Sequence, residues 1–249
     1  MQAKKSFGQH FLVDKRVLER IASLVKGDII FEIGPGTGAL TEYLQDHKSV
    51  TLLEADRDLV GDLSERFPKM KVINTDAARA DFDALAGSDA WTLVGNLPYN
   101  ASAAIVDRAM SAKNPPQSLV IMVQKEQADR MRAKPGEMGL LSVVVQFGYK
   151  LKKAFDVPPD AFRPKPRVDS TVLLFTRDAA ISDMEREAVI ALAKAGFRAR
   201  RKQLHRNLAD AGIAPSETIK NALQSLGLRP DIRAQELSVQ NWIDLKKAL

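Results

Sequence analysis

The stretch Ile29-Ile30-Phe31-Glu32-Ile33-Gly34-Pro35-Gly36-Thr37-Gly38 joins a run of mostly apolar residues to three closely spaced glycines. This pattern predicts a buried strand, Ile29–Ile33, that ends in a tight turn before a helix. Glycine has no Cβ, so its backbone takes positive φ values and allows a ligand to approach closely. Open α/β sheets bind their ligands at the carboxyl ends of strands. We therefore expect the backbone of this turn to lie close to a bound ligand.

Strand-like and helix-like segments alternate on both sides of the turn. The sequence predicts further strands at Val50–Glu54, Lys71–Thr75, Ala90–Gly95 and Leu119–Val123. The predicted helices lie within 11–25 and at 39–45, Asp58–Phe67 and Ala103–Met110. Such alternation is typical of βαβ units and a parallel sheet. The expected fold class is α/β, a Rossmann-like sheet with helices on both faces.

The pattern changes after residue 149. Lys150–Asp156 and Val168–Thr176 are strand-like, and the loop between them holds four prolines, which exclude a regular helix or central strand there. We expect two antiparallel runs at the sheet edge, joined by an extended loop. The remaining patterns are helical, at 183–195, 199–210, 216–226 and 239–248. The expected division is a large domain, 1–178, and a small all-helical C-terminal domain, 182–249.

Acidic residues follow two of the expected strands. Glu54 ends one strand twenty residues after Gly34, and Asp76, followed by Ala77, ends the next strand. A carboxylate at the first position can bind both hydroxyls of a ribose, and one at the second can accept from an adenine amine. Each acid alone is equally explained as a strand-end cap. The ordered set of strand ends favours a nucleoside site.

The tetrad Asn96-Leu97-Pro98-Tyr99 follows the expected strand at Ala90–Gly95. Asn96 offers one acceptor and two donors, Pro98 restrains Leu97 to extended geometry, and Tyr99 supplies a flat face. These features suit a planar base whose exocyclic amine donates to the Asn96 and Leu97 carbonyls while its ring stacks on Tyr99. A β-turn with a polar Asn and a core Tyr explains the tetrad alone equally well.

The glycine spacing separates two classes of nucleoside-binding enzyme. A dinucleotide oxidoreductase carries G-x-G-x-x-G, whereas the third glycine here comes one residue early. This spacing and the two edge strands resemble the class I S-adenosylmethionine methyltransferases. The tetrad is similar to the N-[LP]-P-[YF] motif of those that act on exocyclic amines.

The chain resembles more specifically the ribosomal RNA adenine dimethyltransferase family. The resemblance rests on segments in the family's order: Gly8–Leu12, Glu32–Gly38, Asn96–Tyr99, Gln124–Glu126 and Val157–Ser170. It runs from about residue 5 to the end, and the C-terminal tail looks more like the KsgA type than the Erm resistance methylases. It implies S-adenosylmethionine-dependent N6,N6-dimethylation of two adjacent adenosines in the 3′-terminal hairpin of small-subunit (16S) rRNA, during small-subunit biogenesis.

The resemblance also implies residue roles. The implied contacts with S-adenosylmethionine are His10, Leu12, Gly34, Gly36, Glu54, Asp76, Ala77 and Asn96. Among these, Glu54 would hold the ribose and Asp76 the adenine. The tetrad Asn96, Leu97, Pro98 and Tyr99 would carry the catalysis, with Tyr99 stacked on the target base. Many relatives carry Asn at the position of His10.

Two further segments are candidate RNA contacts. Phe162, in the proline-rich loop, is a candidate to stack on the other face of the target base, with a hydrophobic plug as the alternative. Lys194–Arg206 carries six cations, and no acid occurs between Glu187 and Asp210. We expect a helix face suited to RNA phosphates, with a solvated surface as the alternative. The cations expected to contact RNA are Arg198, Arg200, Arg201 and Lys202.

Composition limits the remaining possibilities. The net charge of +6 favours a polyanionic partner, although solubility alone would explain it. Cysteine is absent from the 249 residues, which excludes thiolate metal sites. His47 and His205 share no metal-ligand spacing with carboxylates and are expected at the surface. Neither a signal peptide nor an apolar run of the ~20 residues that span a bilayer is seen.

The resemblance implies that the chain acts on the immature 30S subunit, and together with the composition it leads us to expect a metal-free cytoplasmic monomer. Two alternatives stay open beside the oxidoreductase. One is an Erm-like enzyme that methylates large-subunit RNA. The other is an RNA-binding assembly factor in which methylation is vestigial, although the intact tetrad and the strand-end acids argue against it.

Overall fold

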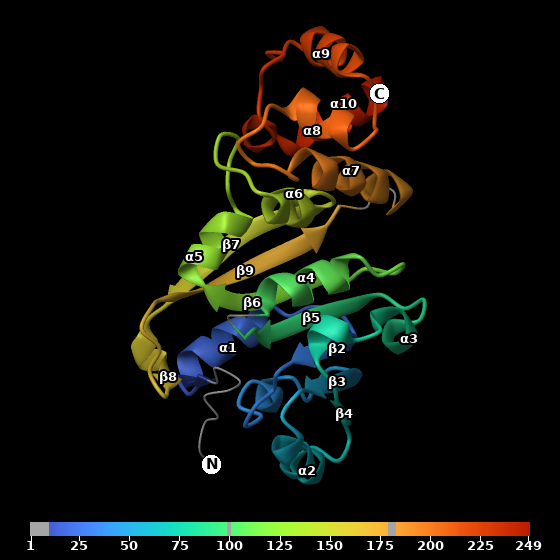
Figure 1. Ribbon diagram of the computed structural model, residues 1–249. Helices are drawn as coiled ribbons and strands as arrows, with labels where there is room; N and C mark the ends of the chain where they lie inside the picture. Colours follow the sequence, from blue (N-terminus) through green and yellow to red (C-terminus); the bar gives the residue numbers. More distant parts are fainter. Residues whose placement is uncertain (1–9, 99–100, 179–182) are drawn as a thin grey trace. The chain divides into compact units, whose positions relative to one another are not determined.

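The computed structural model describes residues 10–98, 101–178 and 183–249, and these form two compact units (Figure 1). The first unit holds the described residues up to Ala128 together with Lys150–Arg177. The second holds Asp129–Tyr149 and the described part of Asp178–Leu249. The sequence predicts one domain for every residue up to 178, whereas residues 129–149 pack with the C-terminal helices. The functions expected of the two domains stay predictions.

In the described part of the chain, the larger of two sheets has seven strands in the order β4-β3-β2-β5-β6-β9-β7 (Figure 1). They are β2 (Ile29–Ile33), β3 (Ser49–Glu54), β4 (Lys71–Asn74), β5 (Trp91–Asn96), β6 (Ser118–Gln124), β7 (Tyr149–Val157) and β9 (Ser170–Arg177). Strands β2 to β6 pair in parallel, and β9 runs antiparallel to β6. The predicted α/β class is confirmed, with the two late strands at one end of the sheet.

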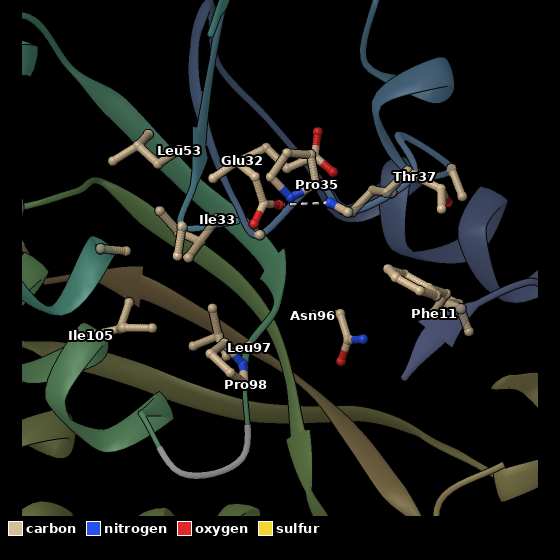
Figure 2. A pocket seen from close by; sticks show the side chains of 18 of the residues that line it. Phe11, Glu32, Ile33, Pro35, Thr37, Leu53, Asn96, Leu97, Pro98 and Ile105 are labelled. Atoms are coloured by element: carbon tan, nitrogen blue, oxygen red, sulfur yellow. Dashed lines mark hydrogen bonds between the residues drawn. The ribbon is translucent and has the colours of Figure 1, made fainter. Parts of the chain in front are cut away.

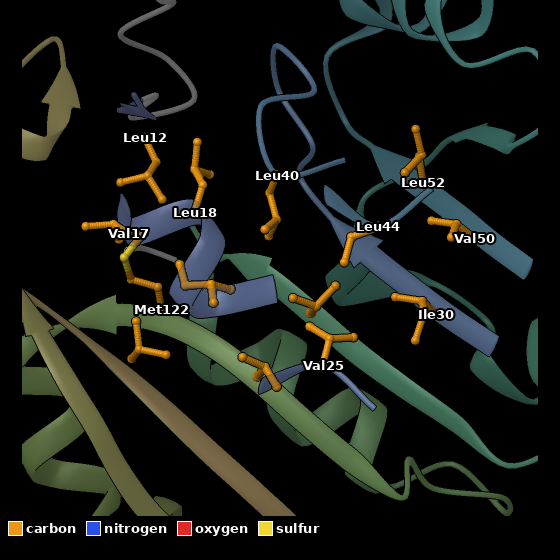
Figure 3. Close-up of a cluster of buried hydrophobic side chains, with 14 of the residues drawn as sticks. Leu12, Val17, Leu18, Val25, Ile30, Leu40, Leu44, Val50, Leu52 and Met122 are labelled. Atoms are coloured by element: carbon orange, nitrogen blue, oxygen red, sulfur yellow. The ribbon is translucent and has the colours of Figure 1, made fainter. Parts of the chain in front are cut away.

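Helices cover both faces of this sheet. They are α1 (Lys15–Leu24), α2 (Arg57–Arg66), α3 (Phe82–Ala86), α4 (Ser102–Met110) and the start of α5 (Lys125–Met131). Neighbouring residues of β2 point to opposite faces. Ile30 belongs to the same buried cluster as Leu18 of α1 (Figure 3). Phe31 packs instead on Trp91 and on Phe82 of α3, at ring-centroid distances of 5.0 and 6.5 Å.

Two local features of the sequence explain where helix α1 begins and which of its faces is buried. Its N-cap Asp14 accepts a hydrogen bond from the backbone N–H of Arg16 at 2.9 Å, an interaction that typically contributes about 1 kcal/mol. The buried residues Val17, Leu18 and Ile21 recur at helical spacing, so one face of the helix packs on the sheet.

A second, two-stranded sheet joins the N-terminal segment to the proline-rich loop. β1 (Phe11–Leu12) pairs antiparallel with β8 (Phe162–Arg163), and Leu12 lies opposite Phe162. The backbone N–H of Val13 also donates to the Ala161 carbonyl at 2.8 Å. The loop is extended at β8 and is paired there with β1, which the sequence did not predict, whereas Pro159–Ala161 form a 3-10 turn rather than extended chain.

The second unit is helical in its described part, from the yellow-green residues 129–149 to the orange and red C-terminal helices in Figure 1. Its helices are α6 (Leu140–Gln146), α7 (Asp183–Gly196), α8 (Leu204–Asp210), α9 (Ser216–Ser225) and α10 (Val239–Ala248). Trp242 is fully buried at the centre of this unit. A Cβ on Gly196 would lie 2.4 Å from the Trp242 ring, so the end of α7 packs closely only because residue 196 is glycine.

Two predicted helices are shorter in the structure. Residues 39–45 form only a 3-10 turn, Thr41–Tyr43. The helix predicted over 199–210 begins at Leu204. The buried side chain of Asn207 explains the late start, since its Nδ2 donates to the carbonyls of Gly196 (2.6 Å) and Ala199 (3.0 Å). These bonds hold the chain after α7 in a turn.

Candidate active site

A pocket in the first unit opens at the carboxyl ends of β2, β3 and β5 (Figure 2). All eight residues predicted to bind the cofactor line it: His10, Leu12, Gly34, Gly36, Glu54, Asp76, Ala77 and Asn96. Leu97 and Pro98 of the tetrad line it as well. Tyr99 lies outside the described residues. The structure thus brings the predicted residues together, while their role towards a cofactor stays a prediction.

The glycine turn forms one wall of the pocket. Gly34 and Gly36 have φ values of +62° and +58°, which side-chain-bearing residues rarely adopt. A Cβ on Gly36 would also lie 2.9 Å from the ring of Phe11. The turn therefore needs glycine at position 36 for its backbone conformation and for its packing.

Glu54 is tied to this turn. Its Oε2 accepts from the backbone N–H of Gly36 at 3.0 Å, and its Oε1 accepts from that of Asp56 at 2.8 Å. The side chain is buried, and burial raises the pKa of its carboxyl. Two backbone donors fix the carboxylate in place, and its remaining lone pairs can accept from ribose hydroxyls.

Glu32 is a pocket residue for which no sequence pattern predicts a role of its own. It is 1% exposed, and its Oε2 accepts from the Thr41 hydroxyl at 2.7 Å. Burial raises the pKa of its carboxyl to about 8, with the charge of Glu54 adding to the rise. Glu32 is therefore mostly neutral at pH 7, next to a second buried acid.

Asp76 lies after β4, on the rim of the pocket. More than half of its side chain is exposed, and its Oδ1 accepts from the backbone N–H of Ala78 at 3.0 Å. This is an N-cap hydrogen bond that orients the carboxylate. Exposure leaves the carboxylate accessible to a donor such as an exocyclic amine.

Asn96 is held by one end of its amide. Its Nδ2 donates to the backbone carbonyl of His10 at 3.0 Å. Its Oδ1 is buried and has no hydrogen-bond partner in the described part of the chain. An unsatisfied buried acceptor costs roughly 1–3 kcal/mol, and a donor from a ligand would relieve that cost. The next residue, Leu97, is anchored by its N–H, which donates to the Met122 carbonyl at 3.0 Å.

Phe162 is one of the candidate RNA contacts, and its position corrects that expectation. Its side chain is fully buried and belongs to the core cluster of the first unit. It presents no face to a base, and the packing role left open from the sequence is the one that fits.

Sequence reasoning missed the apolar walls of the pocket. These are Phe11, Leu18, Ile21, Ile33, Ala39, Leu40, Leu53, Ala55 and Ile105. Several are neighbours of the predicted polar residues, so adjacency to those motifs was the available signal. Apolar residues at such positions are typical of a core, which hides their second role.

The cations predicted to bind RNA lie in the second unit, in the turn between α7 and α8. Arg198, Arg200, Arg201 and Lys202 are all exposed. We call residues 198–202 the basic turn. The predicted helix face is therefore wrong in its secondary structure, although the cations do project into solvent. Lys202 also pairs with Asp210 at 2.9 Å, so one acid does offset the cluster.

The two histidines outside the pocket differ in their surroundings. His47 is half-buried, and its Nδ1 bonds the Gly27 carbonyl at 2.8 Å. His205 is buried, contrary to the surface position predicted for it. Its ring nitrogens bond Ser216 Oγ (2.7 Å) and Gln203 Oε1 (2.9 Å), so it helps to join α8 to α9.

Two features are absent from the part of the chain that the structure describes. No group of three or more His, Asp or Glu side chains is arranged to hold a metal ion among those residues. In the same residues, no helix is both long enough and apolar enough to cross a membrane.

The whole chain is similar to known ribosomal RNA methyltransferases. The family model for ribosomal RNA adenine dimethylase matches residues 1–249. The chain is 41% identical to ribosomal RNA small subunit methyltransferase A of Xanthomonas campestris pv. campestris strain B100, over 98% of this chain and 95% of that protein. The protein of the same name from Xanthomonas oryzae pv. oryzae strain PXO99A gives the same identity and coverage.

Two solved structures share the fold. A dimethyladenosine transferase from Plasmodium falciparum superposes with a TM-score of 0.78 and 22% identity, covering 95% of this chain and 96% of that one. The 23S rRNA methyltransferase ErmE superposes with a TM-score of 0.73 and 24% identity, covering 96% and 99%. At these identities the likeness shows the fold alone.

Proposed function

Because the chain belongs to the ribosomal RNA adenine dimethylase family, we propose that it converts two adjacent adenosines in the 3′-terminal hairpin of small-subunit rRNA to N6,N6-dimethyladenosine. The family makes the chain a methyltransferase of ribosomal RNA. The choice of subunit is supported by the curated relatives named for the small subunit. The observation that carries the chemistry is the buried, unsatisfied Oδ1 of Asn96, an acceptor for an amine.

The pocket residues fit S-adenosylmethionine. When bound, this cofactor supplies an activated methyl group whose leaving group is a neutral thioether. The turn at Gly34 and Gly36 leaves room for its amino-acid portion, because neither residue carries a side chain. Glu54, oriented by two backbone N–H groups, would accept from the ribose hydroxyls. Asp76, exposed at the rim, would accept from the adenine amine.

The tetrad acts on the methyl acceptor. The lone pair of an adenine amine is delocalised into the ring, so the amine is a weak nucleophile. Asn96 Oδ1 and the Leu97 carbonyl accept from its two N–H bonds and orient its lone pair towards the transferred methyl. Positioning and preorganised dipoles then carry the catalysis. The amine proton passes to water.

The remaining interactions concern RNA. Tyr99 stacks on the target base, which must leave its own stack to be reached. The basic turn binds phosphates, since its cations are exposed and three of them, Arg198, Arg200 and Arg201, are arginines. We further propose that the substrate is an immature 30S subunit, that the enzyme acts as a monomer, and that it works in the cytoplasm.

Transfer of labelled methyl groups tests this proposal. The purified chain is incubated with labelled S-adenosylmethionine and with small subunits that lack the modification, and large subunits serve as the comparison. We expect incorporation of four methyl groups per small subunit, which is two for each of two adenosines. Tight binding of small subunits without transfer would support the assembly-factor alternative. Transfer confined to large subunits would support an Erm-like activity.

A further inference from the structure

The orientation of the Asn96 amide is set by its neighbour. A carbonyl oxygen accepts hydrogen bonds but cannot donate them. The carbonyl of His10 lies 3.0 Å from one end of the Asn96 amide, so that end must be the Nδ2 donor. The other end, Oδ1, is therefore the one that remains for a ligand, and it is buried without a partner among the described residues.

The carbonyl of His10 is held in place from the proline-rich loop. The Nδ1 of His10 donates to the Pro164 carbonyl at 2.8 Å, across 154 positions of the chain. Directly after His10, β1 pairs with β8, with Phe11 opposite Arg163 and Leu12 opposite Phe162. Phe162 is fully buried and fixes this pairing to the core.

From these linked hydrogen bonds we propose that His10 is a positioning residue for methyl transfer: clamped to the Pro164 carbonyl, it presents its own carbonyl to Asn96 and so keeps Asn96 Oδ1 directed at the acceptor amine. The proposal rests on the function proposed above, because it concerns the same site. It adds the proline-rich loop as the support of that site.

The chemistry explains why this support matters. Rotating the Asn96 amide by half a turn would replace Oδ1 with an NH2 group, which would repel the N–H groups of the amine. The bond to the His10 carbonyl disfavours that rotamer, because two carbonyl oxygens would then face each other. Loosening β1 removes the penalty, and both orientations become populated.

The side-chain amide of Asn96 reports its orientation directly. In 15N–1H spectra of the uniformly labelled full chain without cofactor, its NH2 pair is assigned by its absence in Asn96→Ser. We expect one Nδ2 proton to be shifted downfield by the bond to the His10 carbonyl. In His10→Ala the clamp to Pro164 is removed, and the pair moves towards the shifts of solvent-exposed amides.

Two further variants make the test specific. His10→Asn keeps an N–H donor at a reach similar to Nδ1 and should restore the wild-type signals. His47→Ala is the matched control, because the Nδ1 of His47 also bonds a backbone carbonyl at 2.8 Å but the residue does not line the pocket. It should leave the Asn96 signals unchanged.

Kinetics separate positioning from direct binding of the cofactor. We expect His10→Ala to lower kcat by about 10- to 100-fold and to weaken S-adenosylmethionine binding, measured by calorimetry, by much less. His10→Asn should recover most of kcat. Unchanged Asn96 signals in His10→Ala would overturn the proposal, as would a fall in kcat/KM that cofactor affinity accounts for in full. If the wild-type chain methylates no RNA, the proposed function fails, whereas the spectra still decide the amide orientation.

Discussion

The backbone N–H of Gly36 donates to Glu54 Oε2 at 3.0 Å, which joins the glycine turn after β2 to the acid at the end of β3. The glycine turn and Glu54 are therefore joined in the structure, although Gly36 and Glu54 lie eighteen residues apart in the sequence. The turn orients the carboxylate, and the carboxylate satisfies a backbone amide of the turn. A change at either residue should affect the other.

Gly36→Ala tests the link between the glycine turn and Glu54. Position 36 has φ +58°, and a Cβ there would lie 2.9 Å from the Phe11 ring. Gly87→Ala is the matched control, since its φ is also +58° but no atom lies within 4 Å of an added Cβ. Both substitutions strain the backbone and should lower the free energy of unfolding by at least about 1 kcal/mol, and Gly36→Ala must also displace the Phe11 ring. Only Gly36→Ala should weaken S-adenosylmethionine binding, measured by calorimetry. Equal cofactor affinity in the two variants would show that the turn does not shape the site.

Asn96→Ala removes the proposed acceptor. We expect kcat to fall by about 10²- to 10³-fold, as when a single preorganised polar group is removed from an active site. Cofactor affinity should change much less, because Glu54 and the glycine turn remain. Single-turnover methyl transfer, together with calorimetry of cofactor binding, measures both quantities. A near-normal rate would contradict the acceptor role.

The buried acid Glu32 should make stability depend on pH. The pKa of its carboxyl is about 8 in the folded protein and near the ordinary 4.5 when unfolded. Between these values the folded protein holds a proton that the unfolded chain has released, so the free energy of unfolding falls as pH rises.

The Gln side chain of Glu32→Gln stays neutral at every pH, so the free energy of unfolding of this variant should fall less as pH rises. Urea unfolding at pH 5 and pH 8 measures the difference, which scales at about 1.4 kcal/mol per pKa unit. The raised pKa of Glu54 gives both proteins a fall in the same direction, so some pH dependence remains in Glu32→Gln. An identical pH dependence in wild type and Glu32→Gln would mean that Glu32 is charged in the folded protein.

Neutralising the basic turn should weaken RNA binding. The triple variant Arg200→Gln, Arg201→Gln, Lys202→Gln should bind small subunits less tightly. The slope of log K against log salt concentration should flatten by about 0.7–0.9 for each phosphate that the variant no longer neutralises. The matched control changes Lys48, Lys69 and Lys71 to Gln. These lysines are exposed and lie at the amino-terminal ends of strands, Lys48 before β3, Lys69 before β4 and Lys71 at the start of β4. The pocket lies at the opposite, carboxyl ends of the strands. If the triple variant and the lysine control lose the same affinity for small subunits, the basic turn contributes only its general positive charge, which would contradict the prediction.

The sequence predicted the parallel strands and the pocket together, for one physical reason. Short apolar runs such as Ile29–Ile33 favour buried strands where they alternate with helical patterns, and parallel strands end at one edge of a sheet. Residues that follow different strands, such as Glu54 and Asn96, therefore line one pocket although they are far apart in the chain.

Other features depend on partners that no local pattern reveals. β1 and β8 are two residues long each and lie about 150 residues apart, so their pairing leaves no periodic signal. The start of α8 is decided by Asn207, whose bonds to Gly196 and Ala199 oppose the helical pattern before Leu204. The sequence shows an aromatic residue in a proline-rich loop at Phe162, which suits base stacking, but it does not show that the side chain is completely buried.

The position of the modification tests the central claim most directly. Small-subunit rRNA lacking the modification is treated, within its subunit, with the purified chain and S-adenosylmethionine, and reverse-transcription stops are mapped. N6,N6-dimethyladenosine blocks base pairing, so we expect a stop at the 3′ member of the adenosine pair in the 3′-terminal hairpin, and a second stop at its neighbour from read-through, both absent with Asn96→Ala. Stops only in large-subunit RNA, or none in either RNA, would contradict the account.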